Sequence, residues 1–276
     1  MLQSGLGGGA RVYRERPQLP PARFFGKYLI VQKIAEGGFG EVYEAADLFS
    51  GRQLALKLPL VNDEHAVDDF LRELDIVRAL DHPNVVPILD AEWVNGLPMI
   101  VYPLGVGSVA DRLEGGPLLP SEALAFSEQL LAGLAHVHER GYLHCDLKPE
   151  NLIVFPGDRV GLSDFGLARD MLEEGVCTTS GTPEYMAPEH HVDGLVSTRS
   201  DVYEAALVVL EMLTGCRPDD GLLTLSLREL FPHSRWAESL DSVLRRALAP
   251  RPEDRHRDAG ELAREFHAAV QSRRLH

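Results

Sequence analysis

Four side chains between positions 144 and 164 have the types and the spacing that phosphoryl transfer requires. Asp146 can accept a hydrogen bond from an attacking hydroxyl, orient it and take up its proton. Lys148, two positions on, can neutralise charge on the transferred group. Asn151 and Asp164 offer hard oxygen ligands, which suit Mg²⁺ between nucleotide phosphates better than a soft metal. Asx residues often only cap loops, but their joint spacing with Lys148 favours a catalytic site.

A glycine-rich stretch lies far upstream, between two predicted strands. Glycines there let the backbone bring its amide groups close to phosphate oxygens. A glycine cluster in a hairpin is more often an ordinary turn, but Lys57 follows at the end of the next predicted strand. We therefore expect a loop that closes over ATP. Its expected ATP contacts are Ala35, Glu36, Gly37, Gly38, Phe39, Gly40 and Val42.

Lys57 can pair with the inner phosphates of ATP if a carboxylate fixes its ammonium group. Our candidate for that carboxylate is Glu73, on the helix that follows. Taken alone, a lysine at a strand end and a glutamate on a helix are usually solvated surface residues. Together with the other motifs, they predict an ion pair between Lys57 and Glu73 that positions the nucleotide.

The secondary structure predicted to position these side chains changes along the chain from mostly strands to mostly helices. Up to position 103, short β-rich runs surround one amphipathic helix, Ala66–Leu80, and indicate an antiparallel sheet. Beyond it the pattern is mostly helical, apart from a short hairpin that would return Asp164 to the site. The predicted strands are Tyr28–Ile34, Glu41–Ala46, Gln53–Leu58, Val85–Leu89 and Met99–Tyr102, and the hairpin strands are Leu152–Phe155 and Arg159–Leu162. The strongest predicted helices are Ser121–Arg140, Ser200–Thr214, Trp236–Ala249 and Ala259–Ser272.

Composition limits the class of protein. The 276 residues are 45% hydrophobic and 25% charged, which is ordinary for a globular chain long enough to form two lobes around a cleft. The formal net charge of −15 argues against a nucleic-acid or anionic-membrane partner. The three cysteines are isolated and indicate neither a zinc site nor a disulfide framework. With no signal-peptide pattern and no long apolar run, we expect a soluble, cytoplasmic protein.

In these motifs, and in Ala187-Pro188-Glu189 downstream, the chain resembles a eukaryotic-type serine/threonine protein kinase of the bacterial kind. The resemblance runs from about Gly26 to Phe266. It implies an α+β, two-lobed fold, with an antiparallel sheet and one main helix in the N-terminal lobe and a mainly helical C-terminal lobe. It also implies transfer of the γ-phosphate of ATP, with Mg²⁺, to a protein serine or threonine. We expect a flexible tail at 1–23, a kinase domain at 24–270 with its lobes at 24–103 and 104–270, and a C-terminal tail at 271–276.

The resemblance implies further roles. Thr182 looks like the residue of the substrate-docking segment that contacts the catalytic loop, and with Lys148 it favours serine or threonine over tyrosine as the acceptor. Asp201 is expected to anchor the catalytic loop, and Glu189 to pair with Arg255. Adenine is expected between Val42 and Ala55 above and Ile153 below.

Some positions depart from the family pattern. Ala35 replaces the first glycine of the loop, which we expect to weaken nucleotide affinity without abolishing it. Cys145, which we expect to be a buried and inert thiol, replaces an arginine that usually receives a phosphate on the activation segment. Either Val101 or Tyr102 is expected at the back of the adenine pocket. Candidate phosphorylation sites are Thr178, Thr179 and Ser180.

Two alternative functions compete with protein phosphorylation. A pseudokinase acting as a nucleotide-binding scaffold would keep the fold, but it usually lacks the lysine, the base or a metal ligand, and none of these is missing. A small-molecule kinase shares the base, the asparagine and the aspartate, but a docking segment with Lys148 and Thr182 serves a protein substrate. The sequence leaves the physiological substrate, the activating signal and the oligomeric state open.

Overall fold

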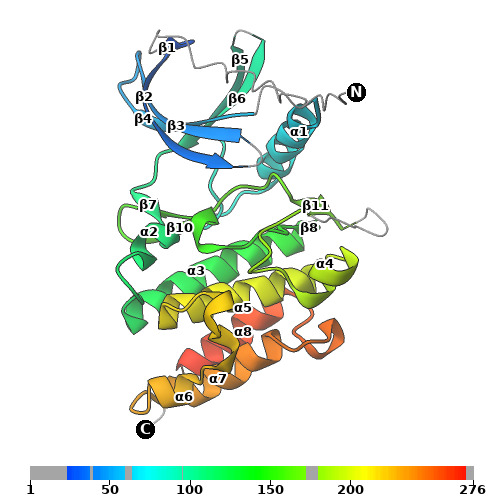
Figure 1. Cartoon of the computed structure of the whole chain (residues 1–276). Helices are drawn as coiled ribbons and strands as arrows, with labels where there is room; N and C mark the ends of the chain where they lie inside the picture. The colour runs from blue at the N-terminus through cyan, green and yellow to red at the C-terminus, as the bar shows by residue number, and fades with distance from the viewer. Residues whose placement is uncertain (1–23, 38–39, 60–63, 95, 172–179, 272–276) are drawn as a thin grey trace, which may run out of the picture.

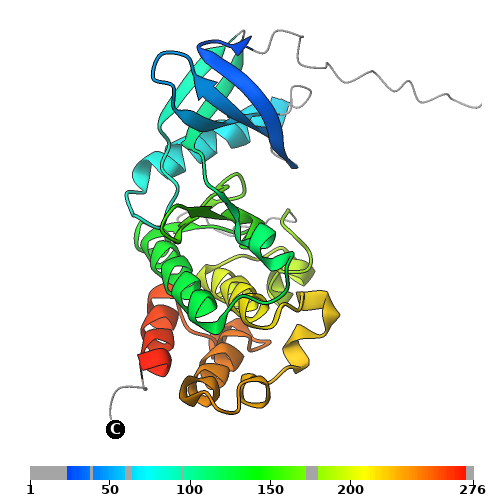
Figure 2. The same ribbon diagram turned by 90° about the vertical axis from the view of Figure 1, so that its left-hand side faces the viewer.

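The structure separates a β-sheet lobe from a helical lobe, as the sequence predicted (Figure 1). In this computed structural model the sheet lobe contains strands β1 to β6 and helix α1, and the helical lobe contains the elements from β7 to α8. Figure 2 shows the curled sheet standing above the helices, and the expected α+β fold is confirmed. The structure describes residues 24–37, 40–59, 64–94, 96–171 and 180–271, so the expected tails lie outside the described residues apart from Gln271.

Six antiparallel strands form the main sheet, in the order β1-β2-β3-β4-β6-β5. Side chains alternate between the two faces of a strand, and one face of this sheet buries Tyr43, Leu56 and Val101 in a hydrophobic core. The other face carries Val42, which pairs with Lys57 in the register of β3 and β4. The strands are β1 (Phe24–Phe25), β2 (Tyr28–Gly37), β3 (Gly40–Asp47), β4 (Gln53–Leu58), β5 (Asp90–Val94) and β6 (Leu97–Pro103).

The strand predicted at Val85–Leu89 is wrong. Its only β-bridge is a parallel one between Val85 and Leu162, and the strand that joins the sheet is β5, just after it. Val85 is apolar because it is buried in the core of the helical lobe. In β5, Asp90 and Glu92 instead bind Lys27 at the edge of the sheet, so the strand lacks an apolar pattern.

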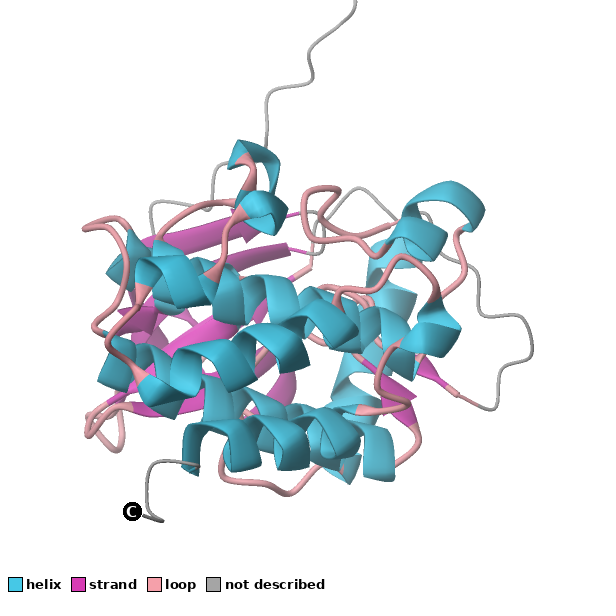
Figure 3. Ribbon diagram, turned by 90° about the horizontal axis from the view of Figure 1, so that it is seen from below, coloured by secondary structure: helices cyan, strands magenta, loops and turns pink. Residues whose placement is uncertain are grey.

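The helical lobe is built around α5 (Thr198–Thr214), in which every residue from Ser200 to Leu213 is buried. A helix that is buried on all sides belongs to the middle of a domain. Seen from below, the helices of this lobe lie side by side beneath the strands (Figure 3). The remaining helices are α1 (Glu64–Ala79), α2 (Val109–Leu113), α3 (Pro120–Glu139), α4 (Pro188–Asp193), α6 (Leu227–Leu230), α7 (Arg235–Ala247) and α8 (Ala259–Gln271).

Both ends of α5 are fixed by its sequence. At the first end, Ser197 caps the helix and forms a capping box with Ser200, which satisfies backbone N–H groups that have no partner inside the helix. At the other end, Gly215 adopts a left-handed conformation with φ of 70°. The sequence therefore sets where the helix begins and ends, and its burial on all sides makes it a support for the loops that pack on it.

Short strands and single turns surround the site. The predicted hairpin is confirmed: β9 (Leu152–Phe155) pairs with β10 (Arg159–Leu162), with Arg159 opposite Phe155. This hairpin connects the loop that contains Asp146 to the segment that contains Asp164. The other short strands are β7 (Gly107–Ser108), β8 (Tyr142–Leu143) and β11 (Arg169–Asp170), and the 3₁₀ turns are Pro149–Asn151, Pro218–Asp220, Leu222–Thr224 and Pro252–Asp254.

Candidate active site

A cavity of about 1140 Å³ opens between the two lobes. Its walls come from the β2–β3 hairpin, β4, α1, the end of β6 and the loop that follows β8. It brings together most of the residues that the sequence singled out. They are Ala35, Glu36, Gly37, Gly40, Val42, Ala55, Lys57, Glu73, Asp146, Lys148, Asn151, Ile153 and Asp164.

The other expected site residues lie elsewhere or are not described. Gly38, Phe39, Thr178 and Thr179 fall outside the described residues. Ser180 is described and is exposed. Thr182 does not line the cavity, but it reaches the site through its contact with Asp146.

Lys57 lies between two carboxylates at the back of the cavity. Its Nζ is 2.6 Å from Oε2 of Glu73 and 2.7 Å from Oδ1 of Asp164, so the predicted ion pair with Glu73 is present. Burial alone would lower the pKa of Lys57, but the charges of Asp164 and Glu73 outweigh it and raise that pKa. Burial would likewise raise the pKa of Asp164, but Lys57 lowers it. The ammonium and the carboxylate therefore both stay charged at neutral pH.

Asp146 sits in a network of polar contacts at the mouth of the cavity. Its Oδ1 accepts hydrogen bonds from the backbone N–H of Thr182 at 3.0 Å and from the Thr182 hydroxyl at 2.8 Å. Nζ of Lys148 is 2.7 Å from Asp146 Oδ2 and donates to Oγ1 of Thr182 at 2.8 Å. The network holds the carboxylate of Asp146 and the ammonium of Lys148 in fixed positions beside each other, and general-base catalysis requires such positioning.

Buried carboxylates of α5 hold the loop that carries Asp146. Asp201 accepts hydrogen bonds from the backbone N–H of His144 at 2.8 Å and of Cys145 at 2.9 Å, which is the anchoring contact expected from the sequence. Glu204, which the sequence did not single out, accepts from the backbone N–H of Leu147 at 3.0 Å. Its only sequence signal is a charged residue within an otherwise apolar helical run.

Two residues beside the site have backbones in the left-handed region, which residues other than glycine rarely adopt. Cys145 has φ of 64° and Asp164 has φ of 61°. Such conformations cost free energy and persist where the surrounding structure enforces them. At Cys145 the enforcing contacts are those to Asp201, and at Asp164 the ion pair with Lys57 contributes.

Asn151 and Asp164 fit a hard cation. The amide nitrogen of Asn151 donates to the carbonyl of Asp146 at 2.8 Å and to its Oδ2 at 3.2 Å, so the amide oxygen is the atom left for a metal. Asp164 adds a carboxylate. Mg²⁺ usually takes one or two protein oxygens together with substrate phosphates. Among the residues that the structure describes, no group of three or more His, Cys, Asp or Glu side chains could hold a metal ion.

The glycine-rich hairpin brings backbone close to the cavity. Gly37 pairs with Gly40 across the turn. Gly40 has φ of 152°, and a Cβ at this position would collide with the carbonyl oxygen of Leu58. Glycine is therefore required at position 40 by both conformation and space.

The structure resolves which residue shares the cavity with Val42, Ala55 and Ile153, the residues expected around adenine. Tyr102 lines the cavity, and Val101 points into the core of the sheet lobe. The phenol of Tyr102 donates a hydrogen bond to Oε1 of Glu73 at 2.6 Å. The pairing register of β6 with β4 places Tyr102 on the face that meets the cavity. The sequence pattern alone does not give that register.

Two further expectations concern structural positions. Glu189 and Arg255 form the expected pair through two contacts of 2.8 Å, and Arg255 is only 2% exposed. Cys145 is buried as expected, and burial, with nearby Asp201 and Glu204, raises its pKa well above that of a free thiol. Cys145 therefore lacks the thiolate character that reactive cysteines need.

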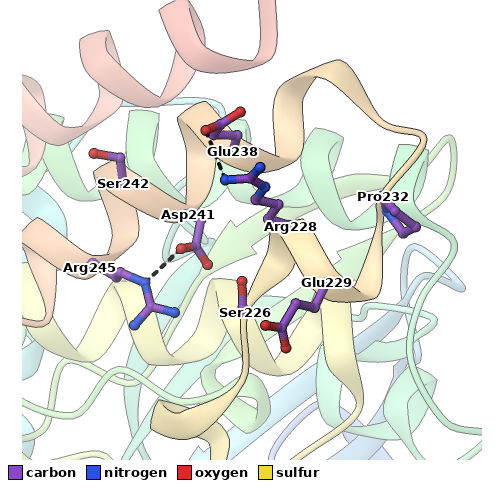
Figure 4. A pocket seen from close by; sticks show the side chains of 8 residues that line it. All are labelled: Ser226, Arg228, Glu229, Pro232, Glu238, Asp241, Ser242 and Arg245. Carbon is purple, nitrogen blue, oxygen red and sulfur yellow. Dashed lines mark hydrogen bonds and ion pairs between the residues drawn. The ribbon is translucent and has the colours of Figure 1, made fainter.

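A second hollow lies in the helical lobe, between α6 and α7 (Figure 4). Both of its arginines pair with acidic residues that line it: Arg228 lies 3.3 Å from Glu238, and Arg245 lies 2.6 Å from Asp241. Because these pairs are at the surface, they contribute little to stability. We assign no chemistry to this hollow.

Lys57 of the sheet lobe thus lines the same cleft as Asp146 and Lys148 of the helical lobe, and such an arrangement of groups between two lobes is typical of protein kinases. The family model described as protein kinase domain matches residues 28–274. The chain belongs to this family.

Its relatives include bacterial serine/threonine-protein kinases. The chain is 31% identical over 271 residues to the serine/threonine-protein kinase PrkC of Bacillus subtilis, covering 92% of this chain and 42% of that protein. It is 35% identical over 271 residues to PknD of Mycobacterium tuberculosis, covering 91% and 41%. It is 34% identical over 263 residues to PknE of Mycobacterium bovis, covering 89% and 46%. The chain therefore spans less than half the length of these relatives. None of the helices in the described residues is long and apolar enough to cross a membrane.

Proposed function

We propose that this chain is an ATP-dependent serine/threonine protein kinase that uses Mg²⁺. The observation that carries the proposal is the network in which Asp146, Lys148 and Thr182 contact one another within 3.0 Å. Under this proposal these three residues act as base, cation and docking residue, beside a cleft that also holds the ion pair of Lys57 and Glu73.

At the nucleotide end, the site is organised to bind phosphates. Lys57, held by Glu73, would pair with the inner phosphates, and the backbone of the glycine-rich hairpin would cover them. Val42, Ala55 and Ile153 would enclose adenine. Mg²⁺ held by Asn151 and Asp164 would neutralise charge on the β- and γ-phosphates. In such a site, nearly all of the rate acceleration comes from positioning and electrostatics.

At the acceptor end, Asp146 would orient the attacking hydroxyl in line with the γ-phosphate and take its proton. Lys148 would stabilise the charge on the transferred group. Thr182 links both residues to the docking segment, so a bound peptide and the catalytic groups share one support. The likeness to serine/threonine-protein kinases supports a serine or threonine as the acceptor. We propose a protein substrate in the cytoplasm, where ATP is available and the cysteines stay reduced.

The experiment that tests the proposal measures transfer of labelled γ-phosphate from Mg-ATP to the chain itself and to generic basic proteins. Asp146→Asn should reduce transfer by about a hundredfold or more, since general-base catalysis supplies at least that factor. Asp158→Asn, at an exposed hairpin turn, is the matched control and should leave transfer unchanged.

Two outcomes would contradict the proposal. If the wild type binds ATP and transfers no phosphate, the pseudokinase alternative is supported instead. If small alcohols compete for the phosphate and proteins do not, the chain is a small-molecule kinase.

A further inference from the structure

The buried carboxylate of Glu73 binds two partners, one through each oxygen. Oε2 lies 2.6 Å from Nζ of Lys57, and Oε1 accepts the hydrogen bond from the Tyr102 hydroxyl, also at 2.6 Å. Glu73 is 1% exposed, so water cannot replace either partner. A buried carboxylate that loses a hydrogen-bond donor is left with a desolvated oxygen, which is costly. The position of Glu73 therefore depends on Tyr102 as well as on Lys57.

The two partners reach Glu73 from neighbouring strands. In the register of β4 and β6, Ala55 lies opposite Tyr102 and Lys57 lies opposite Ile100. Side chains two positions apart on a strand share one face, so Lys57 and Tyr102 both face the cleft. The small Ala55 side chain leaves room for the tyrosine ring on that face. Glu73, by contrast, belongs to α1, so the Tyr102 hydroxyl fastens this helix to the sheet independently of Lys57.

Tyr102 is well suited to act as a permanent donor. Burial, together with the charge of Glu73, raises its pKa well above that of a free tyrosine. The phenol therefore stays protonated throughout the physiological pH range. The contact differs from that of Lys57, whose ammonium also binds Asp164 and would turn toward phosphate when nucleotide binds. The Tyr102 contact needs no such exchange of partners.

We propose that Tyr102 is a positioning residue: its hydroxyl holds Glu73 in the orientation in which that carboxylate presents Lys57 to the phosphates of ATP. The inference rests on the proposed function only as far as nucleotide binding. Without the hydroxyl, Lys57 is positioned for phosphate binding in a smaller fraction of molecules. The apparent affinity for phosphate-bearing nucleotides falls in proportion to that fraction. Adenosine has no phosphate for Lys57 to bind, so its affinity should not change.

The experiment compares Mg-ATP and adenosine binding to the wild-type chain and to Tyr102→Phe by calorimetry. We expect the dissociation constant of Mg-ATP to rise about tenfold and that of adenosine to change less than twofold. Tyr43→Phe is the matched control, because Tyr43 also donates to a glutamate of the sheet lobe, Oε2 of Glu41, at 2.7 Å. It should change neither affinity.

A second variant and a double mutant separate positioning from pocket shape. Tyr102→Met removes the hydroxyl while filling similar space, and it should weaken Mg-ATP binding selectively in the same way. In a Glu73→Gln background, Tyr102→Phe should have little further effect on Mg-ATP binding, because the two residues act as one unit. Additive losses would contradict the proposal, as would equal losses for adenosine and Mg-ATP or no loss for either.

Steady-state kinetics distinguish a failure of the proposed role of Tyr102 from a failure of the proposed kinase activity. In Tyr102→Phe, KM for ATP should rise about tenfold while kcat at saturating ATP stays within twofold, because bound nucleotide restores the position of Lys57. A wild-type chain without phosphoryl transfer would overturn the proposed function. The calorimetric comparison would still decide the role of Tyr102.

Discussion

Glu204 supports the catalytic loop from below by accepting a hydrogen bond from the backbone N–H of Leu147, one residue after Asp146, at 3.0 Å. The other oxygen of this buried carboxylate lies 3.5 Å from Nδ1 of His190, which is also buried. Burial, together with the charge of Asp201, raises the pKa of Glu204 to about 7 despite the proximity of His190. A group that titrates near neutrality thus lies directly under the catalytic loop.

Stability should therefore depend on pH through Glu204. Its pKa is raised above its ordinary value of 4.5, so the folded state holds a proton that the unfolded state has already released. The contribution of protonated Glu204 to the free energy of unfolding is fully present below pH 4.5 and is lost as pH rises through about 7. Burial alone would lower the pKa of His190, but the contact with Glu204 outweighs burial and raises that pKa above 6.5. Stability that depends on His190 is therefore also lost as pH rises. Wild-type stability should fall relative to that of Glu204→Gln between pH 5 and 8, by up to about 3 kcal/mol.

Urea unfolding of both proteins at several pH values between 5 and 8 measures this difference. Glutamine keeps an oxygen that can accept from Leu147 and places an amide beside His190, so the variant should fold. Glu238→Gln, at an exposed position on α7, is the control and should track the wild type at every pH. A stability difference between Glu204→Gln and the wild type that does not change with pH would contradict the prediction.

Thr182→Val should lower kcat about tenfold to a hundredfold. The hydroxyl of Thr182 contacts both Asp146 and Lys148, and hydrogen bonds to charged groups are stronger than neutral ones. Valine keeps the shape and the backbone N–H contact to Asp146 but removes the hydroxyl. KM for ATP should stay unchanged, because Thr182 does not line the cavity between the lobes, where we propose that ATP binds. Thr182→Ser, which restores the hydroxyl, should recover most of the activity, and equal losses in both variants would exclude a role for the hydroxyl.

Residues whose chemistry is distinctive could be found from the sequence, and residues defined by their neighbours could not. Lys57, Asp146 and Asp164 stand out because the reaction needs their side chains at set intervals. Tyr102 and Val101 could not be separated, because the residues from Met99 to Val101 are all apolar and buried, so the strand shows no alternation that would mark its two faces. Glu204 was missed because an acid in a helix is usually solvated, whereas here α5 is buried on all sides and the catalytic loop packs on it.

The apolar runs in the sequence predicted correctly which residues are buried, but they did not always predict which segments pair as strands. Val85 and Val86 are buried as their type suggests, but neither joins the main sheet: Val85 lies in the core of the helical lobe, and Val86 lines the cavity between the lobes. The edge strand β5 was missed for the opposite reason. Its Trp93 is 62% exposed, and its acidic residues bind Lys27, so it carries no alternating apolar pattern.

Gly40→Ala should destabilise the fold by about 1–3 kcal/mol and weaken Mg-ATP binding. Its backbone has φ of 152°, which a side chain disfavours, and the added methyl group would collide with backbone of β4 at Leu58. Gly37→Ala is the matched control, since a Cβ there meets no atom within 4 Å, and its stability should stay within about 0.5 kcal/mol of the wild type. Thermal unfolding and calorimetry measure both quantities. Equal effects in the two variants would show that conformation and space at position 40 are not what requires glycine.

Arg255→Lys should destabilise the helical lobe by about 3 kcal/mol, although the charge is conserved. The guanidinium of Arg255 binds both oxygens of Glu189 at 2.8 Å and also donates to the carbonyls of Ala249 and Arg199. A lysine ammonium cannot reproduce this planar set of donors, so buried acceptors would lose their partners. Arg228→Lys is the control, because Arg228 pairs with Glu238 at the exposed surface and its replacement should cost less than about 0.5 kcal/mol. Denaturant unfolding measures both variants, and a loss for Arg255→Lys no larger than that of the control would mean that the buried pair contributes no more than a surface one.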